Sequence, residues 1–424
     1  MLWKNIKESR KAGLAKRNKI RSLFVMIGIA VFMMAGCSDV LPEAPESEET
    51  AVDHEDYPLK EEDFDNAESI AAVYHDIYDE AVETNTLGSM ETVRRIVARL
   101  GENGYVAVDS GNQVDMTETG QVEKFCRAVD GKKSAALTIV VIQAFGFRKF
   151  DLETEDGNVN VVRGYYQYDQ NGCPQNRSTV SYPADLWQYT EEGYLIFEGE
   201  YFSEENFVLT LSEGSEHTAL RVFPLDETCR ELNRRYILPV GYGQNNIFLS
   251  DWREEDFGEL DFYDIFDIFY PVLYKQPVPY VADENLGVGA VYQIPEEIFE
   301  NVIMTYFKID RESLRRETTY IPEESAYEYR PRGFYEAEYP DIPYPEVVDY
   351  TENQDGTITL IVNAVDPNSN TSMAYSHRVV IRPLNEELFQ FVSNQVIFGE
   401  NDHDLWWHSS RLTKEEWIEV YGGT

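Results

Sequence analysis

The sequence predicts an α+β fold of two domains, each with helices packed on an antiparallel meander sheet, behind a disordered acidic tether. Apolar residues recur at helical spacing twice along the chain, near 70–100 and again near 262–306. Each helical region is followed by short apolar runs separated by turn residues. Helices followed by antiparallel strands favour α+β over a βαβ arrangement. A stretch rich in acids and proline precedes the first helix, which predicts the tether.

Residues 1–36 have the pattern of a secretory leader. Eight basic residues precede an apolar run from Leu23 to Met34, and the small residues Ala35 and Gly36 follow it. As a helix the run would span about 18 Å, which is short of the ~30 Å hydrocarbon core of a bilayer. A cleaved leader is therefore favoured over a permanent transmembrane helix.

Met34-Ala35-Gly36-Cys37 resembles the lipobox of bacterial lipoproteins, in which an aliphatic residue and two small residues precede a cysteine. The resemblance implies cleavage before Cys37, lipidation of its thiol and acylation, with palmitate-type chains, of the new amino terminus. Stable anchoring needs more than one chain, because each buried CH₂ contributes only about 0.8 kcal/mol. The implied location is the outer face of the cytoplasmic membrane of a Gram-positive bacterium. An ordinary secretory leader with an incidental cysteine is the alternative interpretation.

The charge of the chain excludes nucleic acid as a partner. The sequence has 36 basic and 77 acidic residues, a net charge of −41, and the loss of residues 1–36 leaves −48. Such a body is repelled by nucleic acid and by anionic lipid surfaces.

Residues 37–65 are the predicted tether, because this acidic stretch cannot bury enough apolar surface to fold. As a coil it would reach about 30 Å. An acidic interaction tail is the alternative interpretation.

The predicted first domain covers residues 66–250 and opens with helices. Apolar residues over 70–82 share one helical face. Ser89 caps a second helix, which Gly101 ends. The other predicted elements are a helix at 121–129 and strands at 105–108, 135–142, 159–168, 193–202 and 207–211. Turn residues between the later strands favour an antiparallel meander.

The predicted second domain covers residues 251–424 and has four helices. The first places Phe262, Ile265, Phe266, Phe269 and Leu273 on one face and Asp261, Asp264 and Asp267 elsewhere. Pro295 opens the second helix at its N1 position, and Asp310 caps a short third helix. Thr413 and Glu416 form a capping box for the last helix.

The strands of the second domain lie between its helices. A hairpin of 347–351 and 357–365 is joined through an Asp355-Gly356 turn, and strands at 374–384 and 388–398 follow. This helix pair and meander, over Ile294–Ile397, resembles the curved-sheet modules of Gram-positive surface lipoproteins of uncharacterised function. The resemblance rests on pattern and implies no functional residues.

One polar stretch begins like a calcium loop. Asp366, Asn368 and Asn370 stand at positions 1, 3 and 5, but Thr371 and His377 occupy the positions where an EF-hand needs Gly and Glu. A polar turn is therefore predicted, and no metal site.

A second cluster, "ENDHDLWWHSS", contains Trp406, Trp407, His403 and His408. The histidines lack the helical spacing of a zinc ligand pair. These four residues are a candidate platform for a sugar ring or another ligand. Packing of the two tryptophans against the last helix is the alternative interpretation, and metal binding is a third.

No catalytic residue and no cofactor is predicted. Cys126, Cys173 and Cys229 lie in no recognisable nucleophile motif, and three thiols allow at most one disulfide within the mature body, with no means of choosing the pair. Acidic residues are so abundant in this sequence that a pair of carboxylates with plausible spacing is no evidence of catalysis. The best local candidate, Arg253–Asp261, is interpreted as a solvated acidic face.

These observations predict a membrane-anchored extracytoplasmic lipoprotein that is not an enzyme. Its partners would be the membrane, through the lipid, and envelope proteins or glycans. One alternative is a glycan or peptidoglycan hydrolase, which needs two facing carboxylates about 5–9.5 Å apart. Another is a solute-capture lipoprotein, which needs a deep cleft between the domains.

Overall fold

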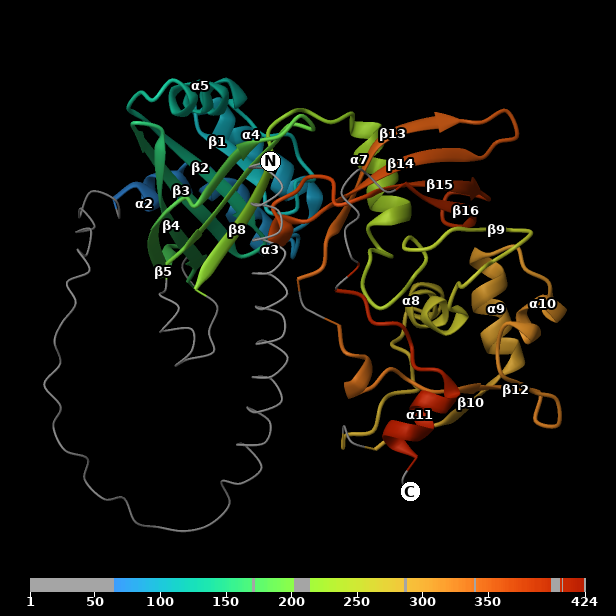
Figure 1. Ribbon diagram of the computed structural model, residues 1–424. Coiled ribbons are helices and arrows are strands. Elements are labelled where there is room, and N and C mark those ends of the chain that lie inside the picture. Colours follow the sequence, from blue (N-terminus) through green and yellow to red (C-terminus); the bar gives the residue numbers. More distant parts are fainter. Residues whose placement is uncertain are drawn as a thin grey trace, which may run out of the picture. The chain divides into compact units, whose positions relative to one another are not determined.

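The computed structural model confirms the predicted α+β class, because helices and largely antiparallel sheets alternate along the chain (Figure 1). It describes residues 65–169, 172–201, 214–285, 288–338, 341–397, 405 and 407–422. The described residues belong to one compact unit. The predicted leader, nearly all of the predicted tether and the predicted strand at 207–211 lie outside the described residues. A search of the described helices finds none with the length and apolar character that a membrane crossing requires.

The first described elements are helices, and strands then dominate. The elements are α2 (Asp65–Ala72), α3 (His75–Glu83), α4 (Met90–Glu102), β1 (Val106–Asp109), α5 (Thr119–Asp130), β2 (Ala135–Gln143), β3 (Gly146–Glu155), β4 (Asn158–Tyr168), β5 (Pro174–Pro183), β6 (Leu186–Tyr189), β7 (Tyr194–Glu200) and β8 (Ser215–Arg221). β3 is absent from the predicted strands because Arg148 and Lys149 interrupt its apolar pattern. Lys149 is nevertheless buried, with its ammonium 2.8 Å from Asp151 Oδ2.

The sheet β1-β2-β3-β4-β5 departs from the predicted meander at one pair of strands. β1 and β2 are parallel, with Val106 opposite Ile139, and α5 is the crossover between them. Parallel neighbours need such a crossover, whereas antiparallel neighbours need only a tight turn. The three remaining pairs of this sheet are antiparallel.

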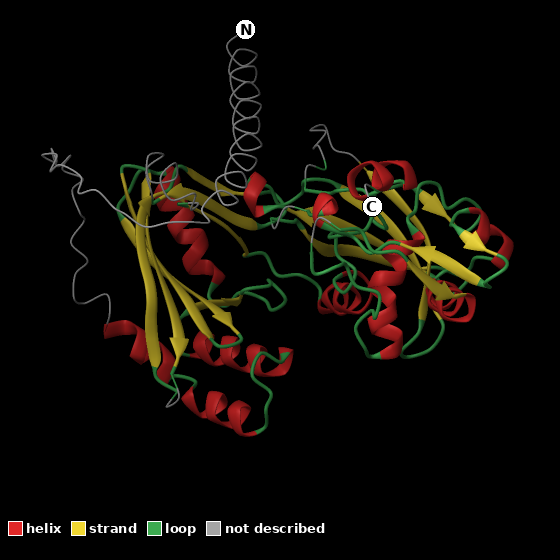
Figure 2. Cartoon of the chain, turned by 90° about the horizontal axis from the view of Figure 1, so that it is seen from below, coloured by secondary structure: helices red, strands yellow, loops and turns green. Residues whose placement is uncertain are grey.

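β2 is buried on both faces, which explains its continuous apolar run. Ile139 and Val141 belong to the core shared with α5 and with the second sheet, β6-β7-β8. Val140 and Ile142 belong to the core under α2, α3 and α4. Successive side chains of a strand point to opposite faces, so each face of the sheet acquires its own core. Helices lie on both sides of this sheet in Figure 2.

The single helix predicted over 70–82 is two helices. The chain leaves the helical path at Tyr74, whose φ is −129°, between α2 and α3. Tyr74 is buried, and its hydroxyl hydrogen-bonds that of Tyr168. The predicted cap of α4 is confirmed, because Ser89 Oγ accepts a hydrogen bond from the Thr92 N–H at 3.2 Å.

The later elements form two further sheets, β13-β14-β15-β16-β9 and β10-β12-β11. The elements are α7 (Glu227–Leu232), the π-helical turn η2 (Asn233–Ile237), β9 (Trp252–Arg253), α8 (Phe262–Tyr274), β10 (Tyr292–Pro295), α9 (Glu296–Tyr306), α10 (Arg311–Arg316), β11 (Tyr320–Ile321), β12 (Ala326–Tyr329), η3 (Phe334–Glu336), β13 (Tyr344–Glu352), β14 (Ile358–Val365), η4 (Pro367–Ser369), β15 (Ser376–Pro383), β16 (Phe389–Ile397) and α11 (Lys414–Tyr421). The predicted hairpin is β13 and β14, with Gly356 at a φ of +80° in its turn. The caps at Asp310 and Thr413 are confirmed.

The predicted start of one helix needs correction, and the burial of one helical residue is unexpected. Pro295 is the N-cap residue of α9 rather than its first helical residue, because it still pairs with Ala326 between β10 and β12. Asp264 lies off the apolar face of α8, as expected, but it is only 1% exposed. An aspartate buried so deeply needs compensating partners.

One core cluster holds most of the later elements together. It includes Phe266 of α8, Phe299 of α9 and Phe391 of β16. Tyr236 and Phe248 belong to the same cluster, although both precede the predicted domain boundary at 250/251.

Candidate functional site

The predicted platform residues are only partly described. Cys37, His403 and Trp406 lie outside the described residues. Trp407 is 1% exposed, and its ring stacks against Tyr375 with the centroids 6.4 Å apart. Trp407 is therefore a core residue in this structure.

His408 lies beside Trp407 and binds a buried carboxylate. Its Nδ1 is 3.0 Å from Glu338 Oε1, and the other oxygen of Glu338 accepts the Gln244 N–H at 2.5 Å. Trp407 and His408 thus fix the last segment of the chain to the body.

A cluster of buried and half-buried charges continues this attachment. We call Asp261, Asp264, Asp267, Arg332 and Arg411 the Asp264 cluster. Arg332 binds both oxygens of Asp264, at 2.9 and 2.8 Å. Arg411 Nη2 lies 2.7 Å from both Asp264 and Asp267. Bidentate guanidinium–carboxylate pairs are among the strongest in proteins.

Partial burial raises the pKa of two carboxyl groups in this cluster. It raises the pKa of Asp261 to about 6, and the charge of Asp264 adds to the effect. It also raises the pKa of Asp267, although Arg411 opposes that change. Asp261, the last residue of the predicted solvated acidic face at Arg253–Asp261, is 24% exposed and caps α8 by accepting the Tyr263 and Asp264 N–H groups.

A second set of buried polar side chains joins β7 and β8 to β13 and β14, and we call this region the seam. At its centre Ile196 and Ala219 pack against Val365. Arg221 pairs with Glu346, and both side chains are more than nine-tenths buried. Tyr194 donates its hydroxyl hydrogen to Glu346 at 2.8 Å. Burial raises the pKa of Glu346, and Arg221 opposes this.

The seam is incompletely paired. Arg230 is 2% exposed and binds Asp115 through Nη2 at 2.6 Å. Its Nε and Nη1 have no hydrogen-bond partner among the described residues, and the same holds for Arg221 Nε, Asn233 Oδ1 and Gln113 Oε1. Unpaired buried polar atoms cost free energy and are where ordered water enters.

The rim of the seam carries a serine, a histidine and a glutamate on neighbouring strands. Ser215 Oγ lies 3.5 Å from His217 Nε2, and His217 Nδ1 lies 3.3 Å from Glu198 Oε2. The register of β7 and β8 places His217 directly opposite Glu198. The side-chain amide of Asn370 donates to the same carboxylate. The order of atoms is that of a nucleophile, a base and an orienting acid.

The three described cysteines are free thiols. Burial raises the pKa of Cys126 and of Cys229 to about 11. Both thiols are therefore poor nucleophiles at neutral pH, because the thiolate is the reactive form. Cys173 is exposed.

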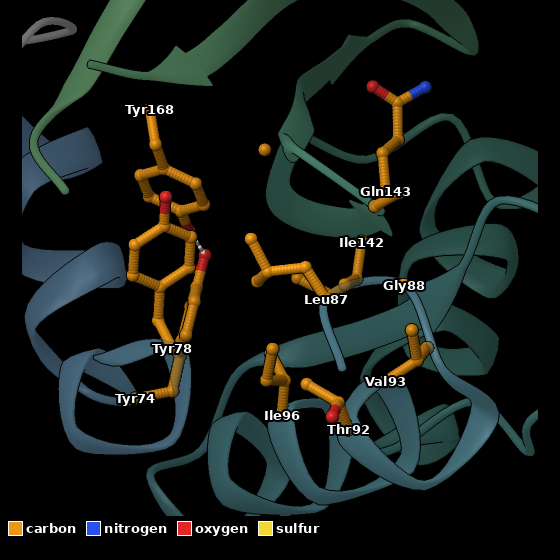
Figure 3. Close-up of a pocket in the computed structure, with 12 residues that line it drawn as sticks. Tyr74, Tyr78, Leu87, Gly88, Thr92, Val93, Ile96, Ile142, Gln143 and Tyr168 are labelled. Atoms are coloured by element: carbon orange, nitrogen blue, oxygen red, sulfur yellow. Dashed lines mark hydrogen bonds between the residues drawn. The ribbon is translucent and has the colours of Figure 1, made fainter. Parts of the chain in front are cut away.

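A small apolar notch lies between α3, α4 and the turn from β2 to β3. Figure 3 shows Tyr74, Tyr78 and Tyr168 on one side and Leu87, Val93 and Ile96 on the other. Its volume is ≈ 10 Å³, room for about one water. This notch is too small for a solute of metabolite size.

Asp366 forms a turn, as the sequence predicts. Its carboxylate accepts the N–H groups of Asn368 and Ser369, at 3.1 and 3.2 Å. The described residues contain no group of three or more His, Cys, Asp or Glu side chains placed to hold a metal ion.

The seam and the Asp264 cluster are absent from the sequence-based candidates. Arg221 and Glu346 are 125 residues apart, and Arg411 is 147 residues from Asp264. No local pattern pairs such residues. The one available signal is the spacing of Asp261, Asp264 and Asp267 along a helix that is otherwise apolar.

The comparisons with known proteins give a family without an assigned activity. No curated protein and no solved structure matches the chain. One family model, described as a family of unknown function (DUF6070), matches residues 60–411. This match covers most of the length of the chain, and the chain therefore belongs to this family of unknown function.

Proposed function

We propose that the chain is a lipid-anchored protein on the outer face of a Gram-positive cytoplasmic membrane, where its folded body binds an envelope partner without catalysis. The observation that carries this proposal is Met34-Ala35-Gly36-Cys37 behind a basic and apolar leader. The family match supports the division of the chain, because it begins at residue 60, near the end of the predicted tether. The leader and most of the tether therefore lie outside the residues that match the family model.

Fractionation of cells tests the anchor. The chain with its own leader is expressed in a Gram-positive host, beside Cys37→Ala and Cys126→Ala variants, in medium with an alkyne-labelled fatty acid. We expect label and membrane retention in the parent and in Cys126→Ala, and neither in Cys37→Ala. Equal labelling and retention of all three proteins would contradict the proposal.

The body supports binding of a macromolecule better than capture of a solute. The notch in Figure 3 is too small for a solute. Trp407, a member of the predicted platform, is a core side chain. An envelope protein or glycan strand needs an exposed surface rather than a closed pocket.

Ser215, His217 and Glu198 favour a second candidate function, hydrolysis of an ester or amide through a serine nucleophile. His217 Nε2 would take the Ser215 proton as Oγ attacks the carbonyl, and would then pass it to the leaving group; water would hydrolyse the acyl-serine. The test is a fluorophosphonate probe applied to the purified full chain. Labelling that is lost in Ser215→Ala and kept in Ser178→Ala supports hydrolysis, and absence of labelling contradicts it.

A further inference from the structure

We propose that the surface around α11 and η3 is a docking site for a basic, amphipathic protein segment. We call this surface the α11 corner and define it by Val288, Val291, Phe334, Tyr335 and Ile418. The inference deepens the proposed function by naming the chemistry of the partner, and it rests on that function only for the place where the two would meet.

The α11 corner exposes large apolar side chains. Val291, Phe334, Tyr335 and Ile418 are each about half exposed, and Val288 is 36% exposed. Phe334 and Tyr335 are consecutive in η3, with ring centroids 5.5 Å apart. Exposed apolar groups that gather at one place mark interaction sites more often than isolated ones do.

Two side chains of α11 pack closely against glycines. A Cβ atom at Gly289 would lie 2.1 Å from the Trp417 ring, and one at Gly333 would lie 2.2 Å from the Tyr421 hydroxyl. Tyr421 in turn packs against Tyr335, with centroids 5.3 Å apart. These contacts place the segment 288–291, η3 and α11 together, and Figure 1 shows α11 beside β10 and β12.

Contacts within the chain hold α11 in place without a partner. The Asp264 cluster holds the chain just ahead of α11 through Arg411, and Glu336 accepts the Leu412 N–H at 2.9 Å. The capping box of Thr413 and Glu416 fixes the first turn of α11. The exposed rings are therefore presented by a rigid support, which lowers the entropy lost on binding.

The charges around the corner select a basic partner. Arg330 and Lys414 share the one carboxylate of Glu328, whereas α11 carries three exposed glutamates, Glu415, Glu416 and Glu419. Glu415 and Glu419 of α11 are exposed and form no ion pair with the described residues. An apolar centre with an acidic rim is complementary to apolar side chains flanked by Lys and Arg.

The same charges argue against two other occupants. An anionic membrane would be repelled by the acidic rim. A second copy would bring the same acids face to face, because a two-fold contact pairs identical surfaces. A cationic amphipathic segment avoids both penalties.

Direct titration tests the docking site. The probe is a fluorescent 18-residue helical peptide of Leu and Lys with one apolar face, and the matched control replaces every Lys with Glu. Anisotropy is measured against the full chain in neutral detergent, with Phe334→Ser/Ile418→Ser and Glu415→Lys/Glu419→Lys variants. Phe145→Ser is the control variant, because Phe145 is 67% exposed in the turn between β2 and β3. Thermal unfolding confirms that each variant is folded.

We expect the Leu/Lys peptide to bind the parent and Phe145→Ser equally, and to bind each corner variant at least tenfold more weakly. The Leu/Glu peptide should not bind, and high salt should weaken binding. No binding of the Leu/Lys peptide, equal binding by the corner variants, or equal binding of both peptides overturns the proposal. Self-association lost in Phe334→Ser/Ile418→Ser, or binding to phosphatidylglycerol vesicles lost in it, overturns it in favour of those occupants. The test uses purified protein, so its result is independent of whether Cys37 is lipidated.

Discussion

The Asp264 cluster and the seam are both built from buried arginines and carboxylates, yet they are paired to different degrees. In the Asp264 cluster both oxygens of Asp264 are bound by guanidinium groups. In the seam Arg221 Nε and two nitrogens of Arg230 have no partner among the described residues. A fully satisfied buried network rigidifies its surroundings, whereas a partly satisfied one keeps part of the desolvation cost.

The difference matches what each region joins. The Asp264 cluster fastens the short segment that carries α11, so rigidity there presents the α11 corner. The seam joins two sets of sheets, and its unpaired atoms leave sites for water. We therefore expect the cluster to be the stiffer and more costly of the two to break.

The largest effect is expected for Asp264→Ala. The substitution leaves Arg332 and Arg411 buried without their main partner, and breaking such a pair costs about 3–5 kcal/mol. Urea unfolding of the full chain measures the loss. Glu80→Ala is the control, because the Glu80–Arg95 pair is exposed and an exposed pair contributes under about 1 kcal/mol. A loss below 1 kcal/mol for Asp264→Ala would show that the cluster does not hold the segment.

Glu346→Ala should cost less, about 1–3 kcal/mol, because Arg221 lies in an incompletely paired seam and already bears part of its desolvation cost. The double variant Arg221→Met/Glu346→Leu should recover most of this loss, since an apolar pair of similar size replaces a buried ion pair at little cost. Urea unfolding of the single and double variants measures both effects. If Glu346→Ala proves more harmful than Asp264→Ala, the comparison between the two regions is wrong.

Gly289→Ala sharpens the comparison at α11. The added Cβ would meet the Trp417 ring at 2.1 Å, and overpacking of this kind costs about 1–3 kcal/mol. Hydrogen exchange should speed up in α11 and stay unchanged in β7 and β8. Gly120→Ala is the matched control, because no atom lies within 4 Å of its added Cβ. Faster exchange in the seam strands would mean that the two regions are not independent.

The last expected effect is a pH dependence of the Asp264 cluster. Burial raises the pKa of Asp261 to about 6, so the folded protein keeps a proton there that the unfolded chain releases above its ordinary pKa of 3.8. Stability therefore falls as pH rises through this window. Asp261→Asn keeps an N-cap acceptor but does not titrate, so between pH 4 and pH 6.5 the variant should lose about 2 kcal/mol less stability than the parent. Parallel losses in the two proteins, measured by urea unfolding, would contradict the assignment.

The sequence predicts best what neighbouring residues decide. The caps at Ser89, Asp310 and Thr413 are correct because a side chain there bonds an N–H two or three positions along. The hairpin of β13 and β14 is correct because its turn residues impose the geometry. β3 is missed because the burial of Lys149 depends on Asp151 and on the sheet around both residues.

The candidate sites are harder, because distant residues build them. Ser215 and His217 are two residues apart on β8, but only the pairing of β7 with β8 brings Glu198 to them. Phe334 and Ile418 are typical core residues in the sequence, and nothing local indicates that both are exposed. The parallel pairing of β1 with β2 is likewise a consequence of packing across α5, not of a local pattern.

The most direct test of the central claim is the intact mass of the mature chain extracted from the membrane of a Gram-positive host. The account predicts a chain that begins at Cys37 and is heavier than its polypeptide by a diacylglyceryl group, with an additional acyl group where the host acylates the amino terminus. A chain that begins at another residue, or that begins at Cys37 with no lipid mass, would contradict the lipid anchor.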